Sequence, residues 1–266
     1  MTIDYLAHLR SESARFADVL ADVDPATAVP TCPDWTVADL LHHLAEVQSF
    51  WAGILRDRPA DEPDNPGPER PDDIGELRQL QRDATDALVA ALDGADDTDP
   101  VWTWYDQDRS VGFIRRRQAH EALVHRWDAE IAAGVDQRPV EPELAADGVS
   151  EALGVMFGGC PEWATPTLDG PLGVLRSEDT GDEWWVRIGR FNGIGPQSGT
   201  VFTDEPTLEL LSRGEAVDRT EGSTFEVVGS AVDLDAWLWG RPTIGPVRAD
   251  GVGLPGLVAV IEQGIS

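Results

Sequence analysis

Apolar residues recur at helical spacing in four separate segments of the first half of the chain. These segments are residues 4–23, 36–56, 74–92 and 112–133. In each of them an apolar side chain returns every three or four positions, which is the period of one face of a helix. Proline residues end the first pattern, and Gly94 and Gly134 follow the third and the fourth. The sequence therefore predicts an N-terminal four-helix bundle with a shared core.

The second of these helices has a defined start. Thr36 and Asp39 have the spacing of a capping box, in which each side chain accepts a hydrogen bond from the other residue's backbone N–H. Residues 58–71, RPADEPDNPGPERP, are rich in Pro, Asp and Glu. Such a segment disfavours regular structure, so we expect an exposed loop inside the domain.

The pattern changes after a proline-containing connector at residues 138–143. One more helix is predicted at residues 143–157, followed by short strand-like runs and two short helices. The strands are expected at residues 184–188, 207–211 and 224–228, and the helices at residues 233–239 and 257–263. The pattern indicates a smaller α/β domain in the second half, with domains at residues 1–140 and 141–266.

Charge and hydropathy narrow the class of protein. The 266 residues include 49 Asp and Glu against 20 Lys and Arg, a formal net charge of −29. This charge repels phosphate backbones and anionic lipid, so we expect neither nucleic acid nor membrane as a partner. No apolar run approaches the roughly 18 residues of a spanning helix, and the N-terminus lacks the pattern of a signal peptide. The sequence predicts a cytoplasmic monomer or small homo-oligomer, in which Cys32 is a small buried residue.

Four of the five histidines fall in two clusters on predicted helices. Glu121 and His125 are four residues apart, so their side chains are neighbours on one helix face and can bind one ion. This face is partly apolar and should turn inward, where a carboxylate needs a partner. On the second helix His43 lies at the margin of the apolar face, whereas His42 points away and is expected in solvent. His120 faces away from Glu121 and is expected at the surface or beside the ligands.

Two histidines and one carboxylate, His43, Glu121 and His125, suit Zn²⁺, Ni²⁺ or Fe²⁺ and leave coordination positions open. An ion held in this way promotes the deprotonation of a bound thiol or water near neutral pH. Asp128 is then expected to accept a hydrogen bond from a ligand histidine, or to be a fourth ligand. The alternative is a surface pair of Glu121 and His125 with His43 packed at the edge of the core, because this spacing is short and common.

Two groups beside the fourth helix could support the fold or take part in binding. Trp102, Trp104 and Tyr105 are expected to anchor their loop on the bundle; the alternative is the wall of a pocket for an unsaturated or aromatic substrate. The run from Arg115 to Arg117 is expected to form a solvated helix face paired with local Asp and Glu; the alternative is that it draws anions to the site.

Two segments resemble the mycothiol-dependent maleylpyruvate isomerase family, a branch of the DinB-like metalloenzymes. They are residues 31–45, TCPDWTVADLLHHLA, and residues 120–129, HEALVHRWDA. The resemblance assigns His43, Glu121 and His125 as metal ligands. It implies a DinB-like four-helix bundle followed by a smaller, sterol-carrier-like C-terminal α/β domain.

A third segment, residues 235–241, DAWLWGR, resembles the Leu-x-Gly-Arg turn of the family's C-terminal domain. Its Arg241 either bridges the domains or holds an anionic group of the thiol cofactor or substrate. The resemblance implies mycothiol as the thiol and a small electrophile as the substrate. We therefore expect an isomerase or S-transferase that uses a divalent metal, zinc before nickel or iron. A metal hydrolase and a non-catalytic binding protein on the same scaffold are the alternatives.

Overall fold

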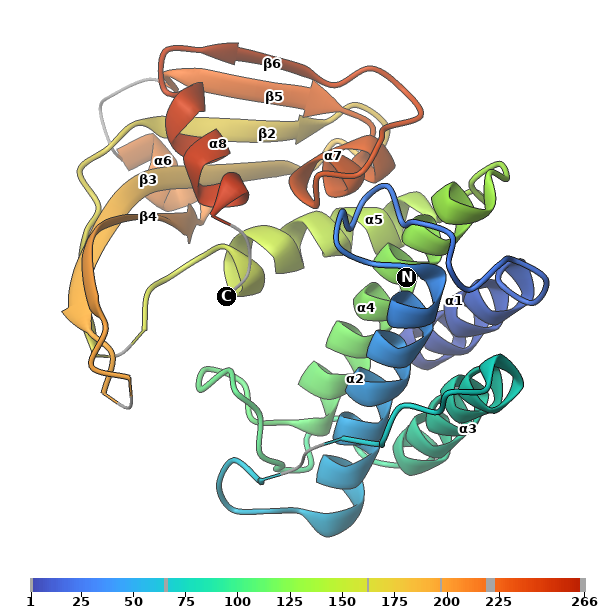
Figure 1. The fold of residues 1–266 in the computed structure, drawn as a ribbon. Coiled ribbons are helices and arrows are strands. Elements are labelled where there is room, and N and C mark those ends of the chain that lie inside the picture. The colour runs from blue at the N-terminus through green and yellow to red at the C-terminus, as the bar shows by residue number, and fades with distance from the viewer. Residues whose placement is uncertain (1, 65–66, 162, 197, 219–222, 264–266) are drawn as a thin grey trace. The chain divides into compact units, whose positions relative to one another are not determined.

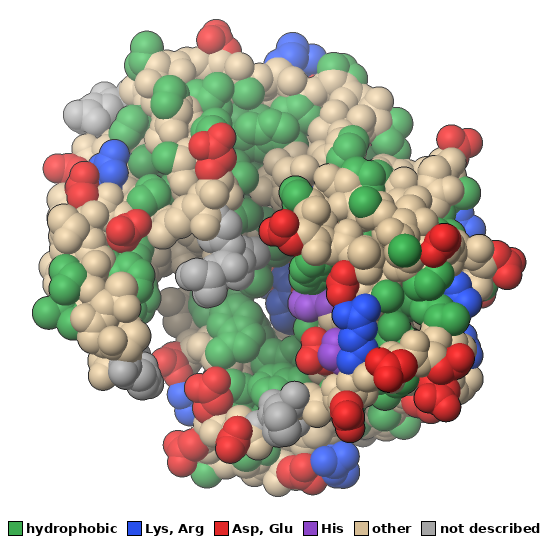
Figure 2. Space-filling model, in the orientation of Figure 1, with side chains coloured by type: hydrophobic (Ala, Val, Ile, Leu, Met, Phe, Trp, Pro, Cys, Tyr) green, Lys and Arg blue, Asp and Glu red, His purple; other side chains and the backbone are tan. Residues whose placement is uncertain are grey.

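The computed structural model describes residues 2–64, 67–161, 163–196, 198–218 and 223–263 (Figure 1). The chain divides into two compact units, an N-terminal unit, Met1–Arg138, and a C-terminal unit, Pro139–Ser266. Among the described residues, the helices are too short or too polar to cross a lipid bilayer. Acidic side chains are scattered over the visible face of the molecule rather than gathered in one patch (Figure 2).

The described part of the N-terminal unit contains four helices. They are α1 (Tyr5–Val19), α2 (Val37–Asp57), α3 (Ile74–Leu92) and α4 (Val111–Ala133). α1 packs mainly on α4, and α2 packs mainly on α3. Phe16, Leu40, Leu44 and Leu77 are among the residues that form their shared apolar core. The predicted four-helix N-terminal region is confirmed, because the apolar stripe of each helix is buried against its neighbours.

The ends of α2 and α4 follow from their sequences. At the start of α2 the Asp39 carboxylate accepts from the backbone N–H of Thr36 at 2.7 Å, while the Thr36 hydroxyl accepts from the backbone N–H of Asp39. The Thr36 hydrogen bonds, with a smaller contribution from Arg70, hold the pKa of Asp39 down at about 2. At the end of α4 Gly134 adopts the left-handed conformation, with φ of 66°. The two helices that carry the candidate ligands thus begin or end at defined residues.

Arg115 and Arg117, near the start of α4, are paired with acidic side chains as expected, with Asp97 and Glu121 respectively, but both are withdrawn from solvent rather than solvated. Arg115 donates to the carbonyl oxygens of Leu92 and Ala95, at 2.8 and 3.0 Å, and so satisfies carbonyl groups at the end of α3. Arg117 is 3% exposed. The carbonyl groups at the end of α3 therefore replace solvent for Arg115, and the Glu121 carboxylate one turn further along α4 replaces it for Arg117.

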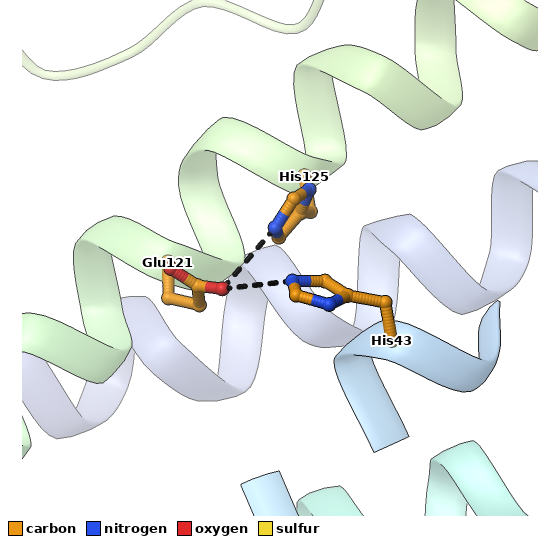
Figure 3. Close-up of side chains that lie close together, drawn as sticks. All are labelled: His43, Glu121 and His125. Carbon is orange, nitrogen blue, oxygen red and sulfur yellow. Dashed lines mark hydrogen bonds and ion pairs between the residues drawn. The ribbon is translucent and has the colours of Figure 1, made fainter. Parts of the chain in front are cut away.

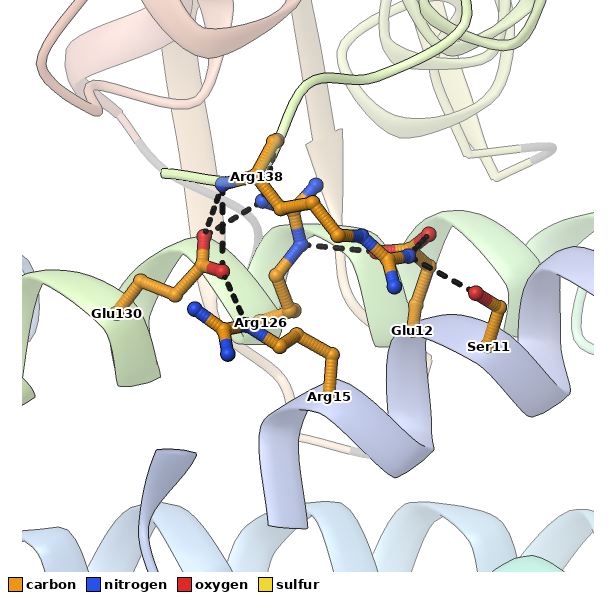
Figure 4. Close-up of polar contacts among 6 residues, drawn as sticks. All are labelled: Ser11, Glu12, Arg15, Arg126, Glu130 and Arg138. Carbon is orange, nitrogen blue, oxygen red and sulfur yellow. Dashed lines mark hydrogen bonds and ion pairs between the residues drawn. The ribbon is translucent and has the colours of Figure 1, made fainter. Parts of the chain in front are cut away.

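A buried ionic cluster joins α1 to α4 (Figure 4). The guanidinium of Arg126 donates to Glu12 at 2.8 Å and to Glu130 at 2.6 Å. Arg15 donates to the other oxygen of Glu130 at 2.8 Å, and Arg138 donates to the other oxygen of Glu12 at 2.5 Å. The side chains of Arg126 and Glu130 are fully buried. Each buried carboxylate is thus shared by two arginines, as buried charge requires.

The C-terminal unit begins with a helix and continues as a sheet with helices. The helix α5 (Pro142–Glu151) runs into a π-helical turn, Ala152–Met156. The described part of the unit then contains β1 (Ala164–Thr167), β2 (Leu172–Ser177), β3 (Glu183–Ile194), β4 (Val201–Leu211), α6 (Arg213–Asp218), β5 (Phe225–Gly229), α7 (Ala231–Leu238), β6 (Arg248–Gly251) and α8 (Leu254–Glu262). Together with the helical N-terminal unit this confirms the predicted mixed fold class.

The sheet has the order β1-β3-β2-β5-β6, with β4 paired to β3. The pair β2 and β5 is parallel, and the other pairs are antiparallel. Apolar side chains of the sheet pack with α5, α7 and α8 in one core, which includes Leu153, Val186, Leu234 and Leu257.

Three strands and one helix of this unit are absent from the sequence prediction. Nearly all residues of β2 are buried, so the strand lacks the alternation of apolar and polar positions that marks a half-exposed strand. It also contains Gly173, which lowers strand propensity. β1 and β6 are four residues long and largely exposed. Such strands depend on their sheet neighbours and leave a weak local pattern.

Candidate metal centre

His43 on α2 and Glu121 and His125 on α4 converge on one point (Figure 3). Oε1 of Glu121 lies 3.4 Å from Nε2 of His43 and 3.1 Å from Nε2 of His125. One ligand atom from each of the three residues lies within 4.8 Å of the others. Two imidazole nitrogens and one carboxylate oxygen at this spacing form a donor set that fits a divalent transition metal.

The exposure of the three side chains decreases from one side of the site to the other. The exposed fraction is 31% for His43, 18% for Glu121 and 9% for His125. The site therefore lies at the edge of the bundle, with His43 towards the solvent and His125 in the interior.

Asp128 lies behind His125. Its buried carboxylate lies 3.0 Å from Nδ1 of His125 and accepts from the hydroxyl of Thr31 at 2.5 Å. Sγ of Cys32, which is half-buried, is 4.0 Å from the same carboxylate. Because an ionised carboxylate only accepts, Nδ1 of His125 carries a hydrogen and Nε2 faces Glu121. The expected contact between Asp128 and a candidate ligand is present in the structure.

The electrostatics of the site favour a positive charge among the three residues. Burial lowers the pKa of His125, but the carboxylates of Glu121 and Asp128 outweigh burial and raise this pKa to about 9. Burial likewise favours a neutral Glu121. The charge of His125 and the hydrogen bonds of both histidines outweigh it and hold the pKa of Glu121 well below its usual range. A proton on His125 thus supplies the positive charge that a metal ion would bring, so the residues fit a cation.

Two contacts with the candidate ligands were not predicted from the sequence. Nη2 of Arg117 donates to Oε2 of Glu121 at 3.0 Å. The ring of Trp35 lies 4.7 Å from the ring of His43 and 6.2 Å from that of His125, measured between centroids. The sequence offers two indications of these contacts: the i,i+4 spacing of Arg117 and Glu121, and the position of Trp35 inside the segment at residues 31–45. Neither signal shows by itself that the side chain touches a candidate ligand.

The expectation that His42 points into solvent is wrong. Its side chain is 15% exposed, which is less than that of His43. Nδ1 lies 3.2 Å from the carboxylate of Glu46, and Nε2 lies 3.2 Å from the carbonyl oxygen of Pro68. The acidic loop that follows α2 thus folds back over this face of the helix, which helical phase alone does not reveal.

His120 is also not at the surface. It is 1% exposed, and its ring packs edge-on against Tyr5 of α1 with 6.1 Å between centroids. The reason is that α1 covers the side of α4 that faces away from Glu121, because these two helices pack against each other.

The aromatic residues before α4 divide into two groups. Trp102 is buried and packs on Trp51, with 6.3 Å between ring centroids, as expected of a loop anchor. Trp104 is 45% exposed and packs edge-on against Phe113 at 5.5 Å. Tyr105 stacks on the same phenylalanine at 5.5 Å. Trp102 thus packs its loop against the helices, whereas the indole of Trp104 stays accessible to solvent.

Arg241 follows α7 in the C-terminal unit. Its Nη1 donates to the carbonyl oxygen of Trp239 at 2.6 Å. The guanidinium is therefore positioned by the turn that the family resemblance picked out. Its contact with a cofactor or substrate stays a prediction.

Comparison with known proteins gives a consistent picture. The family model of the mycothiol maleylpyruvate isomerase N-terminal domain matches residues 6–130, and that of the C-terminal domain matches residues 143–256. A search of curated proteins finds no match. Two similar crystal structures are those of the mycothiol-dependent maleylpyruvate isomerase and of a histidine-to-alanine mutant of it, with TM-scores of 0.58 and 0.59. Both are 14% identical in sequence, and the match covers 93% of this chain and 92% of theirs.

The structural likeness confirms the fold, because it extends over nearly the whole of both chains at low sequence identity. The two family models cover the helical unit and most of the sheet unit in the order of the family. The chain therefore belongs to the mycothiol-dependent maleylpyruvate isomerase family.

Proposed function

We propose that the protein is a metal-dependent isomerase or S-transferase that uses mycothiol either to isomerise a small electrophilic substrate or to form a thioether with it. The convergence of His43, Glu121 and His125 carries this proposal, because it brings a two-histidine, one-carboxylate set to the edge of the bundle. The mycothiol dependence and the isomerase reaction of the similar solved structures support the choice of thiol and reaction class.

In this proposal the N-terminal domain, residues 1–140, holds the metal, with zinc favoured over nickel or iron. When bound, the ion stabilises the thiolate form of the cofactor. Asp128 fixes the tautomer of His125 through Nδ1. The indole of Trp35 packs beside both imidazole rings and restricts how far they can turn.

The thiolate is the nucleophile of the proposed reaction. Its addition to a carbon–carbon double bond, followed by rotation and elimination, gives cis–trans isomerisation. Addition or displacement without elimination of the thiol gives S-transfer. Arg241 in the C-terminal domain, residues 141–266, is proposed to hold an anionic group of the thiol or the substrate through its paired N–H donors.

Elemental analysis of the purified protein, with turnover assays on a panel of electrophiles, tests the proposal. We expect bound zinc and turnover that requires mycothiol. Turnover that is unchanged without a low-molecular-weight thiol would indicate a hydrolase in which water takes the place of the thiol. Protein without metal that also fails to take it up would favour a non-catalytic role.

Neighbouring histidines on α2 provide a matched pair of variants. His43→Ala is expected to abolish stoichiometric metal binding, since it removes one of three donors. His42→Ala removes contacts with Glu46 and Pro68 but no donor, so the metal content should stay at the wild-type level. Equal metal content in the two variants would contradict the ligand assignment.

A further inference from the structure

The two carboxylate oxygens of Glu121 face different partners. Oε1 lies near Nε2 of His125 and Nε2 of His43, at 3.1 and 3.4 Å. Oε2 instead accepts from Nη2 of Arg117 at 3.0 Å. The Arg117 side chain is 4% exposed, so its guanidinium is held away from solvent. Glu121 therefore presents one oxygen to the histidines and the other to a fixed cation.

This contact differs from an ordinary pair on a helix surface. In isolated helices the acidic residue is preferred on the N-terminal side of an i,i+4 pair, and an exposed pair contributes little to stability. Here Arg117 precedes Glu121, and the arginine is buried. A buried guanidinium needs a partner of opposite charge, so separating the two groups is costly. The orientation of the Glu121 carboxylate is thus set from within α4.

We propose that Arg117 is a positioning residue that holds Glu121 as a one-oxygen metal ligand. The inference rests on the metal centre proposed above. A carboxylate that binds through both oxygens takes two coordination positions, whereas one that binds through Oε1 takes one. Arg117 would therefore keep a position open for the thiol or the substrate, which distinguishes a catalytic site from a closed one.

Cobalt substitution tests the proposal, because the visible absorption of Co²⁺ weakens as its coordination number rises. Arg117→Met keeps a long side chain and removes the hydrogen bond that Nη2 donates to Oε2. We expect the cobalt bands of this variant to lose intensity several-fold relative to wild type, as Glu121 turns to bind through both oxygens. The zinc affinity of the variant, measured by competition with a chelator, should equal or exceed that of wild type. The fold-decrease in kcat should be larger than the fold-increase in KM for the thiol.

Two further variants separate the positioning role from charge and folding effects. Arg116→Met removes a positive charge from the adjacent position of α4 and keeps the guanidinium of Arg117, so its cobalt spectrum should match wild type. Arg117→Lys retains one charged donor and should restore part of the band intensity. If Arg117→Met does not fold, Arg117→Gln replaces it: the neutral amide donates a weaker hydrogen bond to Oε2, so a smaller but measurable loss of band intensity is expected.

The outcomes distinguish this inference from the metal centre itself. Wild-type protein that binds neither zinc nor cobalt would overturn the metal centre. Wild-type protein that binds cobalt, with an identical spectrum in the folded Arg117→Met or Arg117→Gln variant, would overturn the role of Arg117 alone. An equal loss of band intensity in Arg116→Met would assign the effect to charge and would also overturn it.

Discussion

Nδ1 of His125 donates to the carboxylate of Asp128 over 3.0 Å, and that carboxylate is fully buried. The two residues are one turn apart on α4, so the helix itself sets their distance. The same carboxylate accepts from the hydroxyl of Thr31, which lies in the segment before α2. Asp128 therefore fixes the ring of one candidate ligand and ties it to the segment that leads into the helix of the other.

Asp128→Asn should weaken metal binding by about 10–100-fold, the usual effect of losing the carboxylate behind a ligand histidine. The amide is neutral, so it supports the Nδ1–H tautomer less well and leaves the imidazole a weaker donor. Affinity is measured by zinc competition with a chelator. Thr31→Val removes a hydrogen bond to the same carboxylate without touching the histidine and should weaken binding less. Wild-type affinity in Asp128→Asn would contradict this account.

The metal-free protein should lose stability as the pH rises from about 6.5 to about 9. The folded-state pKa of His125 is about 9, against about 6.5 in an unfolded chain. Below 6.5 both states bind the proton and the stabilisation is complete; between the two values only the folded state binds it. The free energy of unfolding should therefore fall by up to about 3 kcal/mol over this range. Urea denaturation at pH 6 and pH 9 measures the change.

The lowered pKa of Glu121 gives a stability contribution with the opposite dependence on pH. Its contribution is present above the unfolded-state pKa of about 4.3 and is lost as the pH falls. The pair thus favours a stability maximum between about pH 4.5 and pH 6.5. His125→Gln should flatten the alkaline side of this profile. An unchanged slope above pH 6.5 in that variant would show that other groups cause the alkaline loss.

Helical phase put Glu121 and His125 on one face of α4 and favoured His43 over His42, and the family resemblance selected the same three residues as candidate ligands. The structure brings these three residues together. Trp35 lies outside the helices, and its position over the histidines depends on how the segment before α2 folds back. Arg117 follows the helical period, yet its burial depends on tertiary packing. The local sequence pattern therefore predicts the candidate ligands better than the side chains that contact them.

The ionic cluster between α1 and α4 should be sensitive to the loss of its central arginine. Arg126→Met leaves the buried carboxylates of Glu12 and Glu130 with one arginine each (Figure 4). We expect a loss of about 3–5 kcal/mol in the free energy of unfolding, measured with urea, because buried charges lose a partner. Arg56→Ala breaks an exposed pair with Asp57 and should leave the free energy of unfolding nearly unchanged. Similar losses of stability in the two variants would show that the buried cluster contributes no more to the free energy of unfolding than an exposed ion pair does.

The close approach of β2 and β5 gives a test in the C-terminal unit. Gly173 on β2 pairs with Phe225 on β5, and a Cβ atom added at Gly173 would lie 2.0 Å from Cζ of that phenylalanine. The ring, which is 2% exposed, thus fills the space of the missing side chain. Gly173→Ala should displace it and destabilise the unit by about 1–3 kcal/mol, measured by thermal or urea unfolding.

A control and a rescue show whether the ring is the reason for the glycine. In Gly214→Ala the nearest described atom lies 4.0 Å from the added carbon, so the same substitution in the exposed first turn of α6 should be neutral or slightly stabilising. Phe225→Leu shortens the side chain and should by itself lower the free energy of unfolding. The double variant with Gly173→Ala should lose less stability than the sum of the losses in the two single variants. If the two stability losses simply add, the ring of Phe225 moves aside without cost. Backbone conformation rather than packing would then require glycine in β2.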